Sequence, residues 1–403
     1  MKDMFHKFFR FLSGNLIVAV LLMVVLGIVL GSYMPLWFVR IFITFNGIFT
    51  SVLSFIVPVL ILALVTSAIS ETGSGAGKML VWTVALAYIS TVLAGLFTLG
   101  VSDALFPQMV TIHTDAGGGM SGVLPKEALA PYFTFDFPPM MDTMSALLLS
   151  FMLGLAMLKF KLPVLQGAVL ELRNVVMMVI EKTIIPLLPI FILGVFMKMT
   201  IAGEMRMVTH VYLKIIAVMV LLLMVVLLLQ YLIAGWVSKR NPFMLFHKMF
   251  PAFLTALASS SSAATLPVTL RCADKMGARK NVVNFVIPMC ANIHLSGACV
   301  RTIALAIATM LMFDVPYSGA QMIGFIFIFS VTVLAAPGIP GGVIMAAIGM
   351  IETMLGFHDE MIGIIVTLSI ALDSVGTAVN VCGDGALMMI VNRLTTEAKT
   401  NNC

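Results

Sequence analysis

Four consecutive serines interrupt an apolar region of the chain, within the segment Ala258-Ser-Ser-Ser-Ser-Ala-Ala-Thr-Leu-Pro267. Serine side chains compete for backbone hydrogen bonds and proline lacks a backbone N–H, so this segment interrupts a regular helix. At membrane depth, irregular backbone occurs only where other protein covers it or where it lines a cavity, because each unsatisfied polar group costs several kcal/mol there. If the flanking chain lies in a bilayer, the serine run is therefore predicted to line a cavity.

A second interruption, Ala336-Pro-Gly-Ile-Pro-Gly-Gly342, lies inside another apolar stretch nearer the C-terminus. Paired broken segments of this kind are the best sequence indication of a transporter's binding site. The alternative is that both runs are ordinary loops between helices.

Composition places these segments in a membrane. Hydrophobic residues make up 61% of the chain and charged residues 10%, and the mean hydropathy is +1.12. Soluble domains carry roughly 25% charged residues. Apolar stretches such as 15–33, 80–101 and 215–236 are as long as the ~20 residues that cross a ~30 Å hydrocarbon core as a helix. We therefore expect an all-α polytopic membrane protein. The five cysteines have no metal-binding or disulfide spacing, and we expect no cofactor.

The net charge of +5 does not indicate a nucleic-acid partner, because the basic residues alternate with the apolar spans. Those that lie before, between and after the spans on one predicted side are Lys2, Lys7, Arg10, Lys159, Lys161, Lys239, Arg240, Lys248, Arg271, Lys275, Arg279, Lys280, Arg393 and Lys399. The long connection 106–141 contains a single lysine, Lys126, no arginine and several acidic residues. By the positive-inside rule, both termini are predicted to be cytoplasmic and this connection to lie outside.

Hydropathy divides the chain at about residue 236. Spans are expected near 15–33, 37–70, 79–106, 140–159, 165–200 and 209–236. Beyond them, the apolar segments 244–270 and 317–357 are broken at their centres, and each precedes a helix with polar groups, 281–313 and 360–393. This pattern predicts eight transmembrane helices plus two re-entrant hairpins in inverted repeats, with a site at the midplane. The predicted division is 1–236, six helices, and 237–403, a core of hairpins and polar helices.

The last helix carries four polar residues at spacings of four, three and four: Asp373, Thr377, Asn380 and Asp384. We call these the polar row, since the spacing puts them on one face of a helix. Two carboxylates on one stripe within a membrane span indicate a cation, a cationic substrate group or a wet pathway. The alternative is a hydrogen-bonded seam between helices. Oxygen ligands suit sodium, and they could equally serve a proton.

The preceding helix contains Pro288-Met-Cys-Ala-Asn-Ile-His-Leu-Ser-Gly297, which weakens the helix and would free carbonyls for ions. His294 alone is more often a hydrogen-bonded interior residue than a ligand. Arg301 keeps its charge when buried and needs an acidic partner. That partner is either the substrate or an acid of the polar row, and the sequence leaves both open.

These residues resemble the dicarboxylate/amino acid:cation symporter family. The serine run resembles the tip of that family's first hairpin, Gly338-Ile-Pro-Gly-Gly342 the tip of the second, and the polar row the Asp…Thr…Asn…Asp pattern of its last helix. The resemblance is specific over about 240–393. It implies a glutamate-transporter-like elevator fold, a homotrimer in the bilayer of a bacterial-type inner membrane, and symport of an amino acid or dicarboxylate with Na+, H+ or both.

The resemblance also implies residue roles. Asp373 would hold the substrate's amino group, Thr377 and Asn380 would contact the substrate, and the two tips would enclose it. One cation would bind between Asp384, Asn380 and carbonyls near Cys290 and His294, and another near Ser90 and Thr91. The tip residues implied in substrate binding are Ser260, Ser261, Ser262, Gly338, Ile339 and Pro340.

Departures from the family pattern bear on both the ion and the substrate. The family's Asn-Met-Asp-Gly-Thr is here His294-Leu-Ser-Gly-Ala298, so Ser296 replaces a cation-binding carboxylate and that site is expected to be weak or lost. His294 raises the prospect of proton coupling. Gly376 stands where members with acidic substrates have arginine, which favours a small neutral amino acid. Arg301 stands where many relatives have tyrosine, and the alternative is an acidic amino acid or dicarboxylate bound by Arg301.

Two other classes remain to be distinguished from a symporter. Ser260 or Ser261, His294 and Asp373 supply the side chains of a hydrolase triad, without a nucleophile elbow. A passive channel would also place polar residues around a wet pathway. Labelling by a fluorophosphonate would favour the hydrolase, and counterflow of labelled amino acid in liposomes would favour the carrier.

Overall fold

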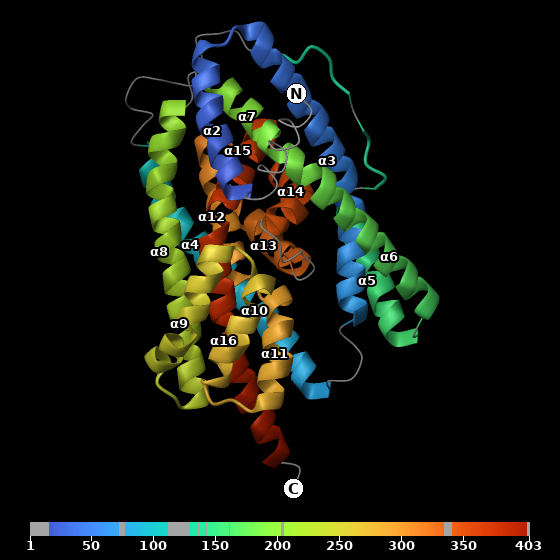
Figure 1. Ribbon diagram of the computed structural model, residues 1–403, viewed down its shortest axis with the longest axis vertical. Helices are drawn as coiled ribbons and strands as arrows, with labels where there is room; N and C mark the ends of the chain where they lie inside the picture. The colour runs from blue at the N-terminus through green and yellow to red at the C-terminus, as the bar shows by residue number, and fades with distance from the viewer. Residues whose placement is uncertain are drawn as a thin grey trace, which may run out of the picture.

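The computed structural model describes residues 16–71, 77–111, 129–135, 137–141, 143–160, 162–202, 205–333 and 341–400. Within these ranges the regular secondary structure is helical and no strand occurs. Figure 1 shows the helices, most of them running roughly along the long axis of the molecule. The expectation of an all-α protein is confirmed.

The first part of the chain forms long apolar helices whose bounds match the predicted spans to within a few residues. They are α2 (Leu16–Tyr33), α3 (Leu36–Glu71), α4 (Gly77–Thr111), α5 (Thr143–Phe160), α6 (Pro163–Val179), the π-helical turn η2 (Ile180–Ile184), α7 (Ile185–Ile201) and α8 (Met205–Ser238). The predicted span 165–200 is thus one rod, α6 through α7. Its π turn precedes Pro186 and Pro189, which have no N–H to donate to the preceding turn.

The second part consists of helices of 13 to 18 residues followed by a last helix of 28 residues. They are α9 (Pro242–Ser259), α10 (Ser262–Asp274), α11 (Lys280–Ile293), α12 (Ser296–Met312), α13 (Gly319–Thr332), α14 (Gly342–Leu355), α15 (Asp359–Ala371) and α16 (Asp373–Thr400). The predicted break near Gly297 is confirmed, because His294 and Leu295 have non-helical backbone angles between α11 and α12. The single predicted helix 360–393 is wrong: Leu372 leaves the helical region, and Asp373 begins a new helix. Aspartate in a first turn is favoured by the helix dipole.

The serine run joins α9 to α10 by a tight turn. Ser260 takes a left-handed conformation (φ 51°, ψ 25°) and its N–H donates to the carbonyl of Ala256. Ser261 then caps α10 by accepting from the N–H of Ala264. The corresponding tip between α13 and α14, including Gly338, Ile339 and Pro340, lies outside the described residues.

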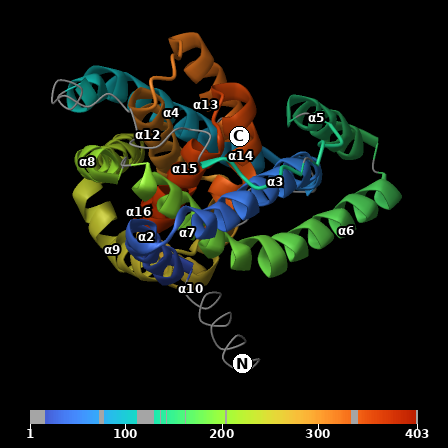
Figure 2. The same cartoon turned by 90° about the horizontal axis from the view of Figure 1, so that it is seen from above.

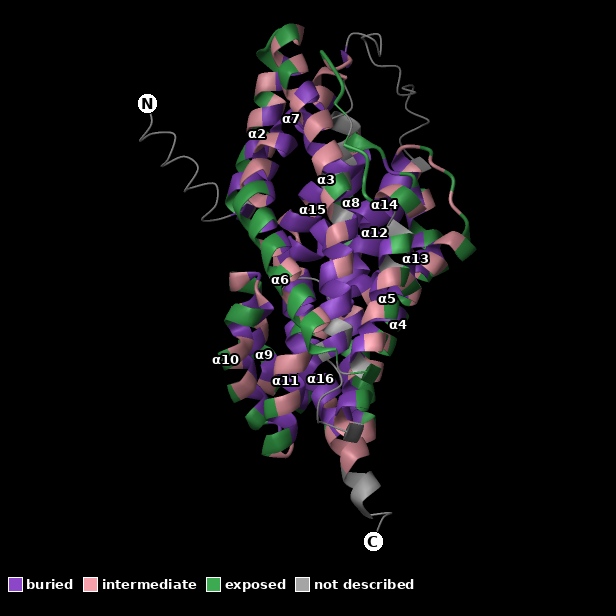
Figure 3. Cartoon of the chain, turned by 90° about the vertical axis from the view of Figure 1, so that its right-hand side faces the viewer, coloured by how far each residue is buried: buried purple, intermediate pink, exposed green. Residues whose placement is uncertain are grey.

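Helices α12 and α16 lie at the centre of the packing. All residues of α12 from Ser296 to Met310 are buried. Helix α16 packs against α8, α9 and α12, while α12 packs against α4. Figure 2, seen from above, has α5 and α6 on the side away from α8 and α9. In Figure 3 the exposed residues gather on outer helices such as α2 and α6.

The outer helices present large apolar side chains, such as Val164, Leu213 and Trp236, which are 86%, 69% and 82% exposed. Such a surface requires lipid around it, and the chain is a multi-pass membrane protein. By length and composition, five helices in the described part can cross a bilayer: 79–110, 163–201, 211–238, 280–312 and 373–395. The eight crossings, the re-entrant hairpins and the division at residue 236 stay predictions.

Candidate functional site

A close helix crossing positions the polar row. A Cβ atom on Gly297 of α12 would lie 2.4 Å from the carbonyl oxygen of Gly376 on α16, so only glycine allows these backbones to approach so closely. At the same crossing, the N–H of Gly297 donates to Oδ1 of Asn380 at 2.7 Å. The break before α12 leaves this N–H without a partner in its own helix, and Asn380 provides one.

Arg301 and Asp373 form a buried ion pair at this crossing. Nη1 of Arg301 donates to Oδ1 of Asp373 at 2.6 Å, and the two side chains are 0% and 9% exposed. Oδ2 of Asp373 accepts from the N–H of Gly341 at 2.9 Å, at the start of α14. Asp373 thus joins α12, α14 and α16. Of the two partners left open for Arg301, an acid of the polar row or the substrate, the structure contains the first.

The rest of the Arg301 guanidinium is open. Its Nε and Nη2 atoms are buried and have no hydrogen-bond partner in the described structure. A Cβ atom on Gly376 would lie 3.1 Å from Nη1, so the arginine lies against the position where a side chain at 376 would begin. Nε and Nη2 are the edge of a guanidinium that binds a carboxylate with two parallel hydrogen bonds.

A second buried pair lies along α16. Nδ1 of His294 is 3.0 Å from Oδ1 of Asp384, with exposures of 0% and 1%. Nε2 of His294 is 3.1 Å from Oγ of Ser90 on α4. Oδ2 of Asp384 has no partner in the described structure, and the carbonyl of Cys290 accepts from the N–H of His294 at 2.9 Å. The structure thus pairs His294 with Asp384 and leaves one carboxylate oxygen without a partner, while the cation site that would also include Asn380 and the carbonyl of Cys290 stays a prediction.

Gln230 of α8 belongs to this cluster and was missed in the sequence. Its Nε2 donates to Oγ of Ser90 at 3.0 Å and to Oγ of Ser296 at 2.9 Å, and lies 3.4 Å from Nε2 of His294. The signal that could have found it is an amide inside the apolar run 215–236, since polar side chains in spans face the protein interior. We call Ser90, Gln230, His294 and Ser296 the amide cluster.

Other predicted site residues are buried or make local hydrogen bonds. The hydroxyl of Thr91 donates to the carbonyl of Ala87 in its own helix, and Thr377 is 7% exposed on α16. The hydroxyl of Ser259 meets that of Thr265 at 3.0 Å within the serine tip. Ser260 and Ser262 are buried, and Ser261 is occupied as a helix cap.

The hydrolase triad suggested by the sequence is not assembled. Nδ1 of His294 lies on Asp384 instead of Asp373, whose two oxygens meet Arg301 and Gly341. The described residues also contain no group of three or more His, Cys, Asp or Glu that could hold a metal ion.

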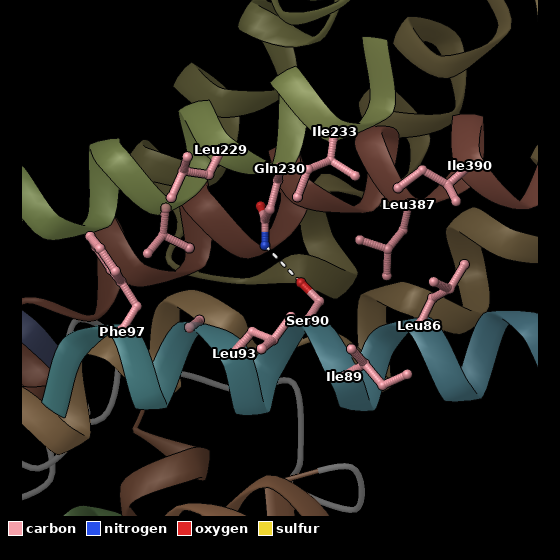
Figure 4. A pocket seen from close by; sticks show the side chains of 12 residues that line it. Leu86, Ile89, Ser90, Leu93, Phe97, Leu229, Gln230, Ile233, Leu387 and Ile390 are labelled. Atoms are coloured by element: carbon pink, nitrogen blue, oxygen red, sulfur yellow. Dashed lines mark hydrogen bonds between the residues drawn. The ribbon is translucent and has the colours of Figure 1, made fainter. Parts of the chain in front are cut away.

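An apolar pocket lies beside the amide cluster, between α4, α8 and α16. It has a volume of about 390 Å³, and Ser90 and Gln230 are the only polar residues of its lining (Figure 4).

A model of the sodium:dicarboxylate symporter family matches residues 16–394. The serine/threonine transporter SstT of Acinetobacter baumannii is 24% identical over 336 residues, which cover 80% of this chain and 83% of that protein. Excitatory amino acid transporter 2 of Mus musculus is 36% identical over 149 residues, covering 37% of this chain. That match spans only 26% of the mouse protein's length.

Proposed function

This chain belongs to the sodium:dicarboxylate symporter family, and we propose that it is a secondary active transporter that takes up an amino acid together with a cation. The observation that carries the proposal is a buried cation–anion pair, Arg301 and Asp373, with a second buried acid, Asp384, about three turns further along α16. Family members are transporters rather than enzymes, which sets the hydrolase alternative aside.

For the substrate, the open edge of Arg301 supports an acidic amino acid. Nη1 remains on Asp373, while Nε and Nη2 are free in the described structure to bind a side-chain carboxylate. Asp373 would contact the substrate's ammonium group. The contact of Arg301 with the Cβ position of Gly376 supports a relocated positive charge, which outweighs the loss of arginine at 376.

A small neutral amino acid is the second candidate, as the sequence favours. Two observations support it: Gly376 carries no charge, and the similarity to a serine/threonine transporter extends over 80% of this chain. In that case Arg301 serves only to neutralise Asp373.

Competition experiments in proteoliposomes separate the two candidates. We expect uptake of labelled aspartate or glutamate, inhibited by excess of either and little affected by serine or alanine. Succinate should compete weakly, because it lacks the ammonium group for Asp373. Inhibition by serine and alanine alone would favour the neutral substrate, and absence of uptake for the whole panel would contradict the proposed function. Separate sodium and proton gradients identify the coupling ion.

For the cation, we propose that Asp384 is a ligand through its open Oδ2 atom. Asp384→Asn should raise the cation concentration for half-maximal uptake at least about tenfold, equivalent to ~1.4 kcal/mol. Removing a charged ligand weakens ion binding more than it alters substrate choice. The control is Asp103→Asn, which removes an exposed carboxylate on α4 that binds Tyr317. Equal cation activation curves for Asp384→Asn and the parent would contradict the assignment.

The remaining family features are proposals as well. They are the elevator movement of a core formed by residues 237–403 with part of the first six helices, a homotrimer, a bacterial-type inner membrane and cytoplasmic termini. Gly338, Ile339 and Pro340 are proposed, with the serine tip, to close over the substrate.

A further inference from the structure

Gln230 is a buried amide whose nitrogen lies among three groups that can accept hydrogen bonds. The side chain is on α8 and the residue is 8% exposed. Ser90 comes from α4, Ser296 from the start of α12, and His294 from the break before it. Distances from Nε2 to their polar atoms are 3.0, 2.9 and 3.4 Å. Three separate elements therefore meet at one nitrogen atom.

Both N–H groups of this amide have an acceptor. A carboxamide nitrogen has two donors, and the hydroxyl oxygens of Ser90 and Ser296 accept them. The Ser90 hydroxyl can then donate to Nε2 of His294, whose Nδ1–H donates to Asp384. The chain of donors runs in one direction, from Gln230 through Ser90 and His294 to the carboxylate.

A hard cation cannot share this position with the amide. Na+ requires oxygen lone pairs directed at the ion, as other hard cations do. Here Ser90 and Ser296 each direct one lone pair at an N–H group of Gln230, and the partial positive charge of these hydrogens would repel a cation placed between the two oxygens. Gln230 Oε1, the only oxygen of the amide, points away from Ser90 in Figure 4 and lies 2.6 Å from where a Cβ atom on Gly383 would be, buried and without a hydrogen-bond partner in the described structure.

We propose that the Gln230 carboxamide is a built-in substitute for a coupling cation, which closes the position between Ser90, Ser296 and His294 to Na+. The family resemblance led us to expect a cation near Ser90 and Thr91, and the amide cluster does not fit one. The open oxygen of Asp384 remains for the coupling ion. This inference rests on the proposed cation-coupled symport for its role, while the binding stoichiometry tests it independently.

The pocket beside the cluster offers no polar group that could replace the amide. Apart from Ser90 and Gln230, the lining is apolar, with Leu93, Leu229 and Leu387 among the side chains that face the cavity in Figure 4. Water and ions are disfavoured against such walls. Without the amide nitrogen, the acceptors of Ser90 and Ser296 would lack a donor on this side.

The test is the number of Na+ ions bound per chain, measured by equilibrium dialysis of purified protein with radioactive sodium and choline as the balancing salt. Gln230→Glu replaces the nitrogen with a carboxylate oxygen at nearly the same volume, and we expect one more Na+ per chain than in the parent. Gln108→Glu is the matched control, an exposed glutamine on α4, and should leave the count unchanged. The thermal midpoint of Gln230→Glu should also rise with sodium concentration more steeply than that of the parent.

Two results would overturn the proposal. One is an unchanged count in a folded Gln230→Glu protein. The other is a Gln230→Leu protein that binds one Na+ fewer than the parent, which would make the amide a ligand.

If Gln230→Glu does not fold, Ser296→Asp supplies the carboxylate from α12. The Ser296→Asp protein should bind no additional Na+ while Gln230 is present, and the double variant Ser296→Asp/Gln230→Ala should bind one more than the parent. A gain in the single variant contradicts the inference. If the parent takes up no amino acid, the proposed function is contradicted, but the number of Na+ ions bound per chain still tests this inference.

Discussion

Replacing Arg301 with methionine is expected to lower the free energy of unfolding by about 3–5 kcal/mol, the usual cost of removing one partner of a buried ion pair. The side chain of Arg301 is fully buried, and Asp373 would keep a charge with only the N–H of Gly341 to stabilise it. Uptake of every substrate should be lost. Unfolding in detergent, by heat or by SDS, and uptake in liposomes give the two readouts.

The double variant Arg301→Met/Asp373→Asn separates charge from packing. Because it leaves no uncompensated charge, most of the lost stability should return, while uptake stays absent. Lys198→Met is the control for a partly exposed pair: Lys198 and Glu360 are 2.5 Å apart, with side chains that are 28% and 27% exposed. Its cost should stay below about 1 kcal/mol. Equal losses for Lys198→Met and Arg301→Met would show that the Arg301–Asp373 pair is not desolvated.

Gly297→Ala should have the second large effect, a loss of about 3 kcal/mol at the upper end of overpacking costs. The added Cβ atom would meet the carbonyl oxygen of Gly376 at 2.4 Å, and a backbone atom cannot rotate away. Separation of α12 from α16 would also break the bond from Gly297 to Asn380, so uptake should fall with stability.

Gly100→Ala provides the comparison for the helix crossing. Gly100 lies inside α4, and a Cβ atom there would meet nothing within 4 Å. Alanine favours a helix by up to about 1 kcal/mol over glycine, so this variant should match or exceed the parent's stability. A Gly297→Ala protein as stable as Gly100→Ala would contradict the close crossing.

The sequence predicts the row of polar residues on α16 because helical spacing determines which residues share a face. It does not predict their partners. Whether Arg301 reaches Asp373 or Asp384 depends on how closely α12 and α16 cross. That distance is set by Gly297, which has no side chain that would mark it as part of a polar site. The sequence therefore leaves both acids open, and the structure pairs Arg301 with Asp373 and His294 with Asp384.

Gln230 and Leu372 were missed for different reasons. Gln230 is one amide in a strongly apolar helix, and a hydropathy value averaged over many residues does not reveal a single polar side chain. Leu372 breaks the last helix although leucine is a good helix former, because Asp373 starts a new helix whose carboxylate binds Gly341 and Arg301. Tertiary contacts override propensity there. The spans of the first six helices, which depend only on the length of apolar segments, were predicted to within a few residues.

The Arg301–Asp373 pair also bears on the empty carrier. An unpaired carboxylate at Asp373 would add a net charge to any part of the protein that crosses the low-dielectric layer without substrate, and moving such a charge is costly. Arg301 neutralises it from within, as a substrate ammonium group would. A carrier with this internal counter-charge can return unloaded without a counter-ion at Asp373, so we expect net accumulation of substrate rather than obligatory exchange of internal for external substrate.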